Sequence, residues 1–168
     1  ITVACYIRFI GRRIPYICEY LLSNAKSYMG KKGYKLNVLF FGIDKKNRFD
    51  GATNLGKLSR EELFELYKKC DFGMTASMSN ISLVPYEMLA TGLPLVEFRN
   101  GSYKFFLGDD TALLIDFDYK ELADKIIEAV NSPEILEKMH ENVEKKLKKL
   151  SWDNTCEQFW NILNSVKE

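Results

Sequence analysis

The stretch DFGMTASMSNISLVPYEMLATGLPLVE, residues 71–97, decides how this chain folds. Its residue order predicts a buried strand at 72–76, a turn rich in serine and asparagine, and then a short helix. Pro85 suits the start of that helix, and Gly92 followed by Pro94 ends it. A second apolar strand follows, so the stretch predicts one strand–helix–strand unit of a parallel sheet.

The start of the short helix is the first candidate binding site. Free backbone N–H groups and the positive end of the helix dipole meet there, and both favour an anion. A nucleotide diphosphate held at this point would bring its sugar close to Glu87, whose carboxylate accepts hydrogen bonds from hydroxyl groups. The alternative is that Glu87 only complements the helix dipole. Small polar residues on the approach favour the binding site: Ser77, Ser79, Asn80 and Ser82.

Segments typical of strands and of helices alternate through the first two-thirds of the chain. Besides the segments above, strands are predicted at 1–6, 36–42, 54–56, 95–98 and 112–115. Helices are predicted at 14–30, 59–70, 118–131, from 133 onward, and at 152–167. The sequences Ser59-Arg60-Glu61-Glu62 and Asp118-Tyr119-Lys120-Glu121 each have the form of a capping box at a helix start.

This alternation implies parallel strands joined by right-handed crossover connections. The predicted fold class is therefore α/β, with a Rossmann-like open parallel sheet covered by helices on both faces. In such a sheet, ligands bind beyond the carboxyl ends of the strands. The short helix that carries Glu87 begins at that edge.

The bulk properties predict one domain over residues 1–168, with the terminal helix, at about 152–167, packing at its edge. Because strand-like sequence begins at Ile1 rather than after a methionine, we expect a fragment of a longer protein. A net charge of +1 gives no reason to expect a nucleic-acid partner. The four cysteines are widely spaced, which indicates reduced thiols in a cytosolic protein.

The turn after the first strand reads Arg8-Phe9-Ile10-Gly11-Arg12-Arg13. It lacks the three spaced glycines of a dinucleotide-binding fingerprint, but its three guanidinium groups suit bidentate contacts to phosphate. The alternative is a solvated basic loop. Because the turn lies at the ligand edge, we expect at least one of Arg8, Arg12 and Arg13 to contact phosphate.

The sequence gives little support for a metal site or a histidine-based catalytic triad. Asp116-Phe117-Asp118 has the form of a metal-binding Asp-x-Asp motif, but a helix cap at Asp118 explains it better. The only histidine, His140, lies among glutamate and lysine residues in a predicted helix. We therefore expect no metal ion in the chemistry of this chain.

Two runs of sequence resemble the carboxyl-terminal domain of GT-B glycosyltransferases of family four: NLGKLSREELFELYKKCDFGMTAS and LVPYEMLATGLPLVE. Tyr67 and Cys70-Asp71 fill the family's junction between helix and strand. Glu87-Met88-Leu89-Ala90, with Gly92 and Pro94, fills its acidic helix motif. The opening CYIRFIGRRIPYICEYLL is similar to the same domain of bacterial rhamnosyltransferases. The resemblance implies one half of a GT-B fold.

The resemblance also implies roles for residues at the ligand edge. Glu87 would bind the ribose hydroxyls of a nucleotide sugar, and the helix start would offer N–H groups to the diphosphate. Ser79 occupies the position of the family's first glutamate, which helps to hold the transferred sugar. The candidate catalytic residues are Glu87 and Arg12. The candidate donor-binding residues are Arg8, Arg13, Lys57, Leu58, Ser79, Ser82, Leu83, Val84 and Glu87, with Lys57 and Leu58 beside the base.

The implied activity is retaining transfer of a sugar from a dTDP-, UDP- or GDP-sugar to a cell-surface polysaccharide or other glycan, without a cofactor or metal. This chain would be the donor-binding half, inactive alone, and its partner would be an amino-terminal acceptor domain. The expected location is the cytoplasm or the inner face of the membrane, through peripheral association of the full-length protein. Two alternatives remain open. One is a catalytically inactive nucleotide-binding or regulatory module, favoured by Ser79. The other is an unrelated α/β domain.

Overall fold

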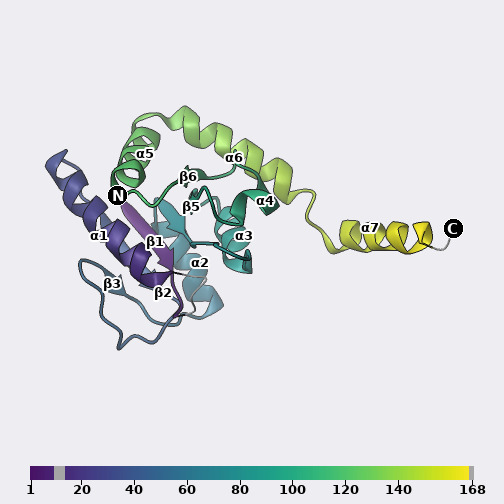
Figure 1. Cartoon of the computed structure of the whole chain (residues 1–168), viewed down its shortest axis with the longest axis horizontal. Coiled ribbons are helices and arrows are strands. Elements are labelled where there is room, and N and C mark those ends of the chain that lie inside the picture. The colour runs from purple at the N-terminus through teal and green to yellow at the C-terminus, as the bar shows by residue number, and fades with distance from the viewer. Residues whose placement is uncertain (10–13, 167–168) are drawn as a thin grey trace.

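The structure is a computed structural model that describes residues 1–9 and 14–166. Six strands form one all-parallel sheet in the order β3-β2-β1-β4-β5-β6 (Figure 1). The strands are β1 (Thr2–Tyr6), β2 (Asn37–Phe41), β3 (Thr53–Asn54), β4 (Phe72–Met74), β5 (Leu95–Phe98) and β6 (Leu113–Ile115). From β1 the chain builds outward to β3 and then returns to β4 on the other side of β1, so the strand order reverses between β1 and β4.

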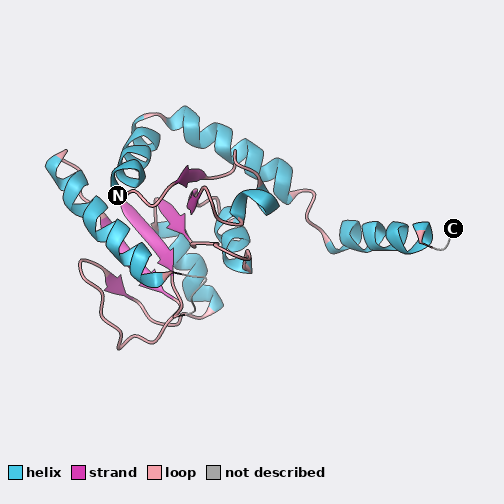
Figure 2. Ribbon diagram, in the orientation of Figure 1, coloured by secondary structure: helices cyan, strands magenta, loops and turns pink. Residues whose placement is uncertain are grey.

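Seven helices connect or follow these strands in the described part of the chain (Figure 2). They are α1 (Pro15–Lys31), α2 (Arg60–Lys69), α3 (Leu83–Ala90), α4 (Tyr103–Leu107), α5 (Tyr119–Asn131), α6 (Pro133–Leu147) and α7 (Trp152–Ser165). Every predicted strand and helix is present with boundaries shifted by a few residues. The five-residue helix α4 was not predicted from the sequence.

Both faces of the sheet are covered, as the fold class predicts. Val3 and Cys5 of β1 belong to a core cluster with α1 and α5, whereas Ala4 belongs to a second cluster with α2, α3 and α4. This alternation buries β1 from both sides, which explains why its sequence is continuously apolar rather than alternating. None of the helices in the described residues is long and apolar enough to cross a membrane.

Two helix starts show how local sequence fixes these boundaries. At α2 the predicted capping box forms: Glu62 N–H donates to Ser59 Oγ at 3.2 Å, and Ser59 N–H donates to Glu62 Oε2 at 2.7 Å. At α5 Asp118 caps the helix by accepting from Lys120 N–H at 2.8 Å, but the bonds between Asp118 and Glu121 that define a capping box do not form. Glu121 bonds elsewhere, so the prediction of a second reciprocal box was wrong.

The terminal helix does not pack at the domain edge, contrary to the sequence-based expectation. All described residues of α7 are exposed, and the helix extends away from the sheet and its covering helices (Figure 1). Its start is nevertheless well defined, because Ser151 Oγ accepts from Asn154 N–H at 3.1 Å. The sheet faces are already covered by the other helices, so they offer α7 no uncovered apolar surface.

Gly73 allows α3 to lie close against β4. A Cβ atom at this position would come within 2.6 Å of Met88 Sδ and 2.7 Å of a Leu95 methyl carbon. Such distances force neighbouring side chains to move. The helix that carries Glu87 is therefore held at a separation that a larger residue would increase.

We predict that Gly73→Ala lowers the free energy of unfolding by about 1–3 kcal/mol, because it overpacks a filled core. Urea-induced unfolding of the two proteins provides the measurement. Gly30→Ala is the matched control, because a Cβ at Gly30 of α1 meets nothing within 4 Å. That variant should be as stable as the parent or slightly more stable. Equal effects of the two substitutions would contradict the close packing of α3 on β4.

Candidate functional site

The reversal of strand order places two loops side by side at the carboxyl edge of the sheet. β1 and β4 are neighbours, with Val3 paired to Phe72 and Cys5 to Met74. The loop after β1 contains Arg8, which is exposed, and the loop after β4 leads into α3. Ligands of doubly wound sheets bind in the crevice at such a reversal. Arg12 and Arg13, predicted to bind phosphate, lie outside the described residues.

The N-terminus of α3, at the end of the loop after β4, has no side-chain cap. Ser82 is the N-cap residue, with extended backbone angles, but its side chain accepts no hydrogen bond from the first turn. The Ser82 hydroxyl is itself buried and has no hydrogen-bond partner among the described residues. A buried hydroxyl usually has a partner. The predicted anion site thus combines helix N–H groups that lack a side-chain cap with a hydroxyl that lacks a partner among the described residues.

Glu87 lies beyond the reach of the helix dipole at the α3 start. The first turn of α3 contains no acidic residue, and Glu87 occupies the fifth position of the helix. Because interaction with the dipole falls off within the first turn, it does not account for this acid. The half-buried Glu87 carboxylate therefore has no explanation in the dipole of α3, and its predicted role in binding a ligand stays a prediction.

Tyr67 is a second polar group beside Glu87, and sequence analysis identified it only as a junction residue. The ring is 1% exposed and packs against Phe41 and Phe64, with centroids 6.0 and 6.4 Å away. Its hydroxyl has no hydrogen-bond partner in the described part of the chain. Burial, and next the charge of Glu87, raise the pKa of Tyr67 above its ordinary value. At neutral pH the hydroxyl therefore keeps its proton and remains a donor.

Lys57 and Leu58 lie in the turn between β3 and α2, at the same edge. Gly56 anchors that turn, since its N–H donates to Asn54 Oδ1 at 3.0 Å and its carbonyl accepts from Gly42 N–H at 2.9 Å. Leu58 is half-buried in the second core cluster, whereas Lys57 is exposed. Of the pair, only the Lys57 side chain is fully open to a ligand.

Ser79 is exposed in the loop between β4 and α3. Earlier residues of this loop are buried, and Ala76 has a positive φ of 50°, which residues other than glycine rarely adopt. A backbone held in such a conformation persists only when surrounding contacts fix it. Those contacts come from Glu97 on β5.

Glu97 is fully buried, and sequence analysis missed it. One feature of the sequence could have indicated this buried acid: Glu97 is the single charged residue in an otherwise apolar strand, Leu95-Val96-Glu97-Phe98. Its carboxylate accepts hydrogen bonds from the Thr75 hydroxyl, from Ser77 N–H at 3.1 Å and from the Ser77 hydroxyl at 3.3 Å. Burial outweighs these bonds and raises the pKa of Glu97 above its ordinary value of 4.5.

The raised pKa of Glu97 predicts a specific dependence of stability on pH. The folded chain holds the proton of Glu97 at pH values where the unfolded chain has released it. Its contribution to the free energy of unfolding therefore decreases as pH rises from about 4.5 through the folded-state pKa. The titratable groups whose charges couple to Glu97 are Cys5 on β1 and Tyr103 on α4, and burial raises the pKa of both.

Glu97→Gln should remove this component, because glutamine does not titrate. We predict that the free energy of unfolding of the parent, measured relative to that of Glu97→Gln, decreases as pH rises from about 4 to about 8, which is roughly the range above the ordinary pKa of a glutamate. Urea unfolding at a series of pH values measures the difference. A difference that does not vary with pH would contradict the raised pKa.

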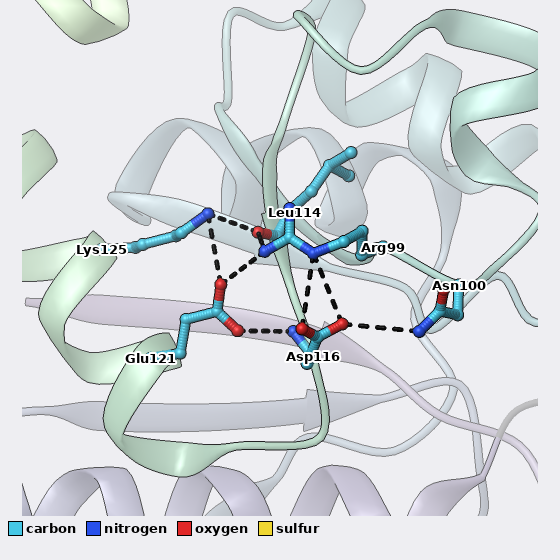
Figure 3. Close-up of polar contacts among 6 residues, drawn as sticks. All are labelled: Arg99, Asn100, Leu114, Asp116, Glu121 and Lys125. Atoms are coloured by element: carbon cyan, nitrogen blue, oxygen red, sulfur yellow. Dashed lines mark hydrogen bonds and ion pairs between the residues drawn. The ribbon is translucent and has the colours of Figure 1, made fainter.

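Arg99 forms a network that joins the ends of β5 and β6 to α5 (Figure 3). Its Nη2 donates to Glu121 Oε1 at 2.5 Å and to the Leu114 carbonyl at 3.1 Å, and Nε lies 3.4 Å from Asp116 Oδ1. Glu121 Oε2 accepts from Asp116 N–H at 2.7 Å. The Glu121 carboxylate therefore bonds to Arg99 and Asp116 and does not form the predicted capping box with Asp118. Asp116 and Asp118 both have structural partners.

We predict that Glu121→Gln lowers the free energy of unfolding by about 1–2 kcal/mol, since charge-assisted hydrogen bonds to a partly buried carboxylate are weakened. The Glu121 side chain is 24% exposed. Glu144→Gln on α6 is the control, since Glu144 is 53% exposed and pairs only on the surface. Its effect should stay within about 0.5 kcal/mol. If Glu144→Gln lowered the free energy of unfolding as much as Glu121→Gln, the Arg99 network would contribute no more to stability than a surface ion pair.

The chain resembles known proteins at the level of both sequence family and fold. Residues 19–146 match a family model described as glycosyl transferases group 1. No curated protein matches the chain. One similar solved structure is sucrose-phosphate synthase from Thermosynechococcus elongatus, at 19% identity and a TM-score of 0.69 over 98% of this chain and 45% of that one.

Two further structures show the same likeness. The alpha,alpha-trehalose 6-phosphate synthase from Burkholderia multivorans has 15% identity and a TM-score of 0.76 over 99% of this chain and 42% of its own. The Anabaena protein HepE, in complex with UDP and glucose, has 14% identity and a TM-score of 0.71 over 98% and 48%. This chain spans less than half of each. The likeness confirms the predicted fold, a Rossmann-like half of a GT-B fold.

Proposed function

The chain belongs to the group 1 glycosyl transferases, and on that basis we propose that it is the carboxyl-terminal, donor-binding half of a retaining glycosyltransferase of family four. The full-length enzyme transfers a sugar from a nucleotide diphosphate sugar to a glycan acceptor. The observation that carries this proposal is the uncapped start of α3 at the reversal of strand order, with the unpartnered hydroxyl of Ser82 beside it.

In this proposal the diphosphate binds at the start of α3. The N–H groups of Leu83 and Val84 and the Ser82 hydroxyl donate to phosphate oxygens, and the helix dipole favours their charge. Glu87, one turn further along, accepts hydrogen bonds from the ribose hydroxyls. Tyr67 keeps its proton near Glu87, and its hydroxyl is a donor without a partner among the described residues. Lys57 and Leu58, in the turn before α2, lie beside the base.

Catalysis follows from the charge that develops as the donor breaks. Cleavage between the anomeric carbon and the diphosphate leaves negative charge on the diphosphate and positive charge on the sugar. Donors fixed in advance around the leaving group stabilise that transition state, and one of them contributes about 3 kcal/mol. We assign this role to the α3 start together with Arg8, Arg12 and Arg13, so no metal ion takes part.

The identity of the transferred sugar depends on Ser79. At this exposed position, serine gives the sugar a neighbour that is shorter than the family's glutamate and carries no charge. We propose a deoxy sugar such as rhamnose and a bacterial polysaccharide acceptor, in line with the resemblance of the opening segment. The competing function is a nucleotide-binding module without transfer activity. Donor turnover by the full-length protein separates the two.

The acceptor site belongs to an amino-terminal partner domain in this proposal. The exposed apolar side chains of α7 support a partner, because large apolar surface of this kind marks an interaction site. They include Trp152, Phe159, Trp160 and Ile162, which are 85%, 61%, 62% and 61% exposed. The full-length enzyme would work in the cytoplasm or peripherally at the inner face of the membrane.

Calorimetric titration of the full-length protein with UDP, dTDP and GDP tests the donor site. HepE is a structural relative that has been seen with UDP-glucose, so UDP comes first. We predict that Glu87→Gln weakens binding of the preferred nucleotide about 10- to 100-fold, because hydrogen bonds to a charged acceptor contribute about 1.5–3 kcal/mol.

Glu144→Gln on α6 is the matched control for this titration, since it removes an exposed carboxylate remote from the crevice. It should leave affinity unchanged. If Glu87→Gln binds the nucleotide as tightly as the parent, the ribose is not held by Glu87 and the site is misplaced.

A further inference from the structure

The loop between β4 and α3 is tied to the sheet interior by one buried carboxylate. Among the described residues, Glu97 accepts hydrogen bonds from other strands and loops only at Thr75 and Ser77. The Thr75 and Ser77 hydroxyls also lie 3.1 Å from each other. All three residues are fully buried. Glu97 thus joins β5 to the two positions at which the chain leaves β4.

Ser77 is held from a second side by the turn that begins α4. Its carbonyl accepts from Ser102 N–H at 2.6 Å and from the Ser102 hydroxyl at 2.9 Å. A Cβ atom on Gly101 would lie 2.5 Å from the same carbonyl oxygen. The peptide of Ser77 is therefore fixed by its N–H group, its hydroxyl and its carbonyl. Only glycine at position 101 permits this approach.

These contacts determine where the following residues go. Ala76, between Thr75 and Ser77, adopts a left-handed conformation that its side chain disfavours, and the bonds on either side of it hold that turn. From Ser77 the chain reaches Ser82, the N-cap of α3, after four intervening residues. A displacement of Ser77 would therefore move the Ser82 hydroxyl and the first N–H groups of α3.

We propose that Glu97 is a positioning residue for donor binding: through Thr75 and Ser77 it fixes the loop that carries Ser82 and the α3 start to the diphosphate. Because Glu97 is fully buried, it acts through these residues and does not touch the donor. The inference rests on the proposed function, since it concerns the same site.

The chemistry explains why an acid occupies this buried position. A carboxylate accepts from several donors at once, and here two hydroxyl groups and one N–H group converge on it. Burial of a carboxylate is unfavourable unless such donors compensate for lost water. Glutamine has the same shape. Its carbonyl can accept from Ser77 N–H, and its amide can donate to the two hydroxyls, which rotate to accept. Alanine can do neither.

The test measures nucleotide affinity and donor KM in the full-length protein, with whichever of UDP, dTDP and GDP the parent binds. We expect Glu97→Ala to weaken binding about 10- to 100-fold, the effect of misplacing a site by about 1 Å. Glu97→Gln should restore most of the affinity. A merely structural role would lower stability without this selective change in donor KM.

A second pair of variants decides the question if Glu97→Ala does not fold. Thr75→Val removes a buried hydroxyl from the Glu97 cluster. Thr111→Val removes an equally buried hydroxyl that donates to the Leu107 carbonyl at 3.1 Å, away from the loop. We expect Thr75→Val to raise the donor KM at least about fivefold, with Thr111→Val unchanged.

The two possible failures are distinguishable. If the parent binds nucleotide and Thr75→Val binds it as tightly as Thr111→Val, the positioning role of Glu97 is wrong while the donor site stands. If the parent binds none of the three nucleotides, the proposed function is wrong and this inference is rejected with it.

Discussion

A parallel sheet that is covered on both faces leaves the free N–H groups of its connecting helices at the carboxyl ends of its strands, and this constraint governs the molecule. Apolar layers on either side bury Val3, Ala4 and Cys5 of β1 and all of β4, whereas the two end residues of β1 are partly exposed. The reversal of strand order between them then opens a crevice at the carboxyl edge, because successive connections diverge there. A ligand that is held by the N–H groups of a helix start therefore binds at that edge. Gly73 contributes by letting α3 lie close to β4.

The polar groups around this crevice divide into two kinds. Those of the supporting layer are fully hydrogen-bonded: Glu97 accepts from Thr75 and Ser77, and Arg99 joins the strand ends to α5. Two others are buried without a partner among the described residues, the hydroxyls of Ser82 and Tyr67. Buried polar groups are generally satisfied, so these two hydroxyls are the unusual ones. The division separates residues that hold the loop and strand ends in place from the two whose hydrogen bonds are unmade.

The sequence predicted the strands, most helices and the edge at which the candidate site lies, because apolar runs, caps and Gly-Pro stops are local features. It missed whatever depends on contacts between distant segments. Glu121 matches a capping box locally, yet Arg99, distant in sequence, takes its carboxylate. The exposed face of α7 looks like a packing surface, but the sheet it would cover is already occupied. Glu97 was overlooked because its partners, Thr75 and Ser77, belong to another strand–loop segment.

The proposed function depends above all on one contact, that of a nucleoside diphosphate with the backbone N–H groups of Leu83 and Val84. Nuclear magnetic resonance of ¹⁵N-labelled protein during titration with the nucleotide that it binds tests this claim most directly. We predict that the amide resonances of Leu83 and Val84 shift most strongly, while the amide resonance of Gly30, at the far end of α1, does not shift. Strong shifts elsewhere with unchanged Leu83 and Val84 amides would contradict it.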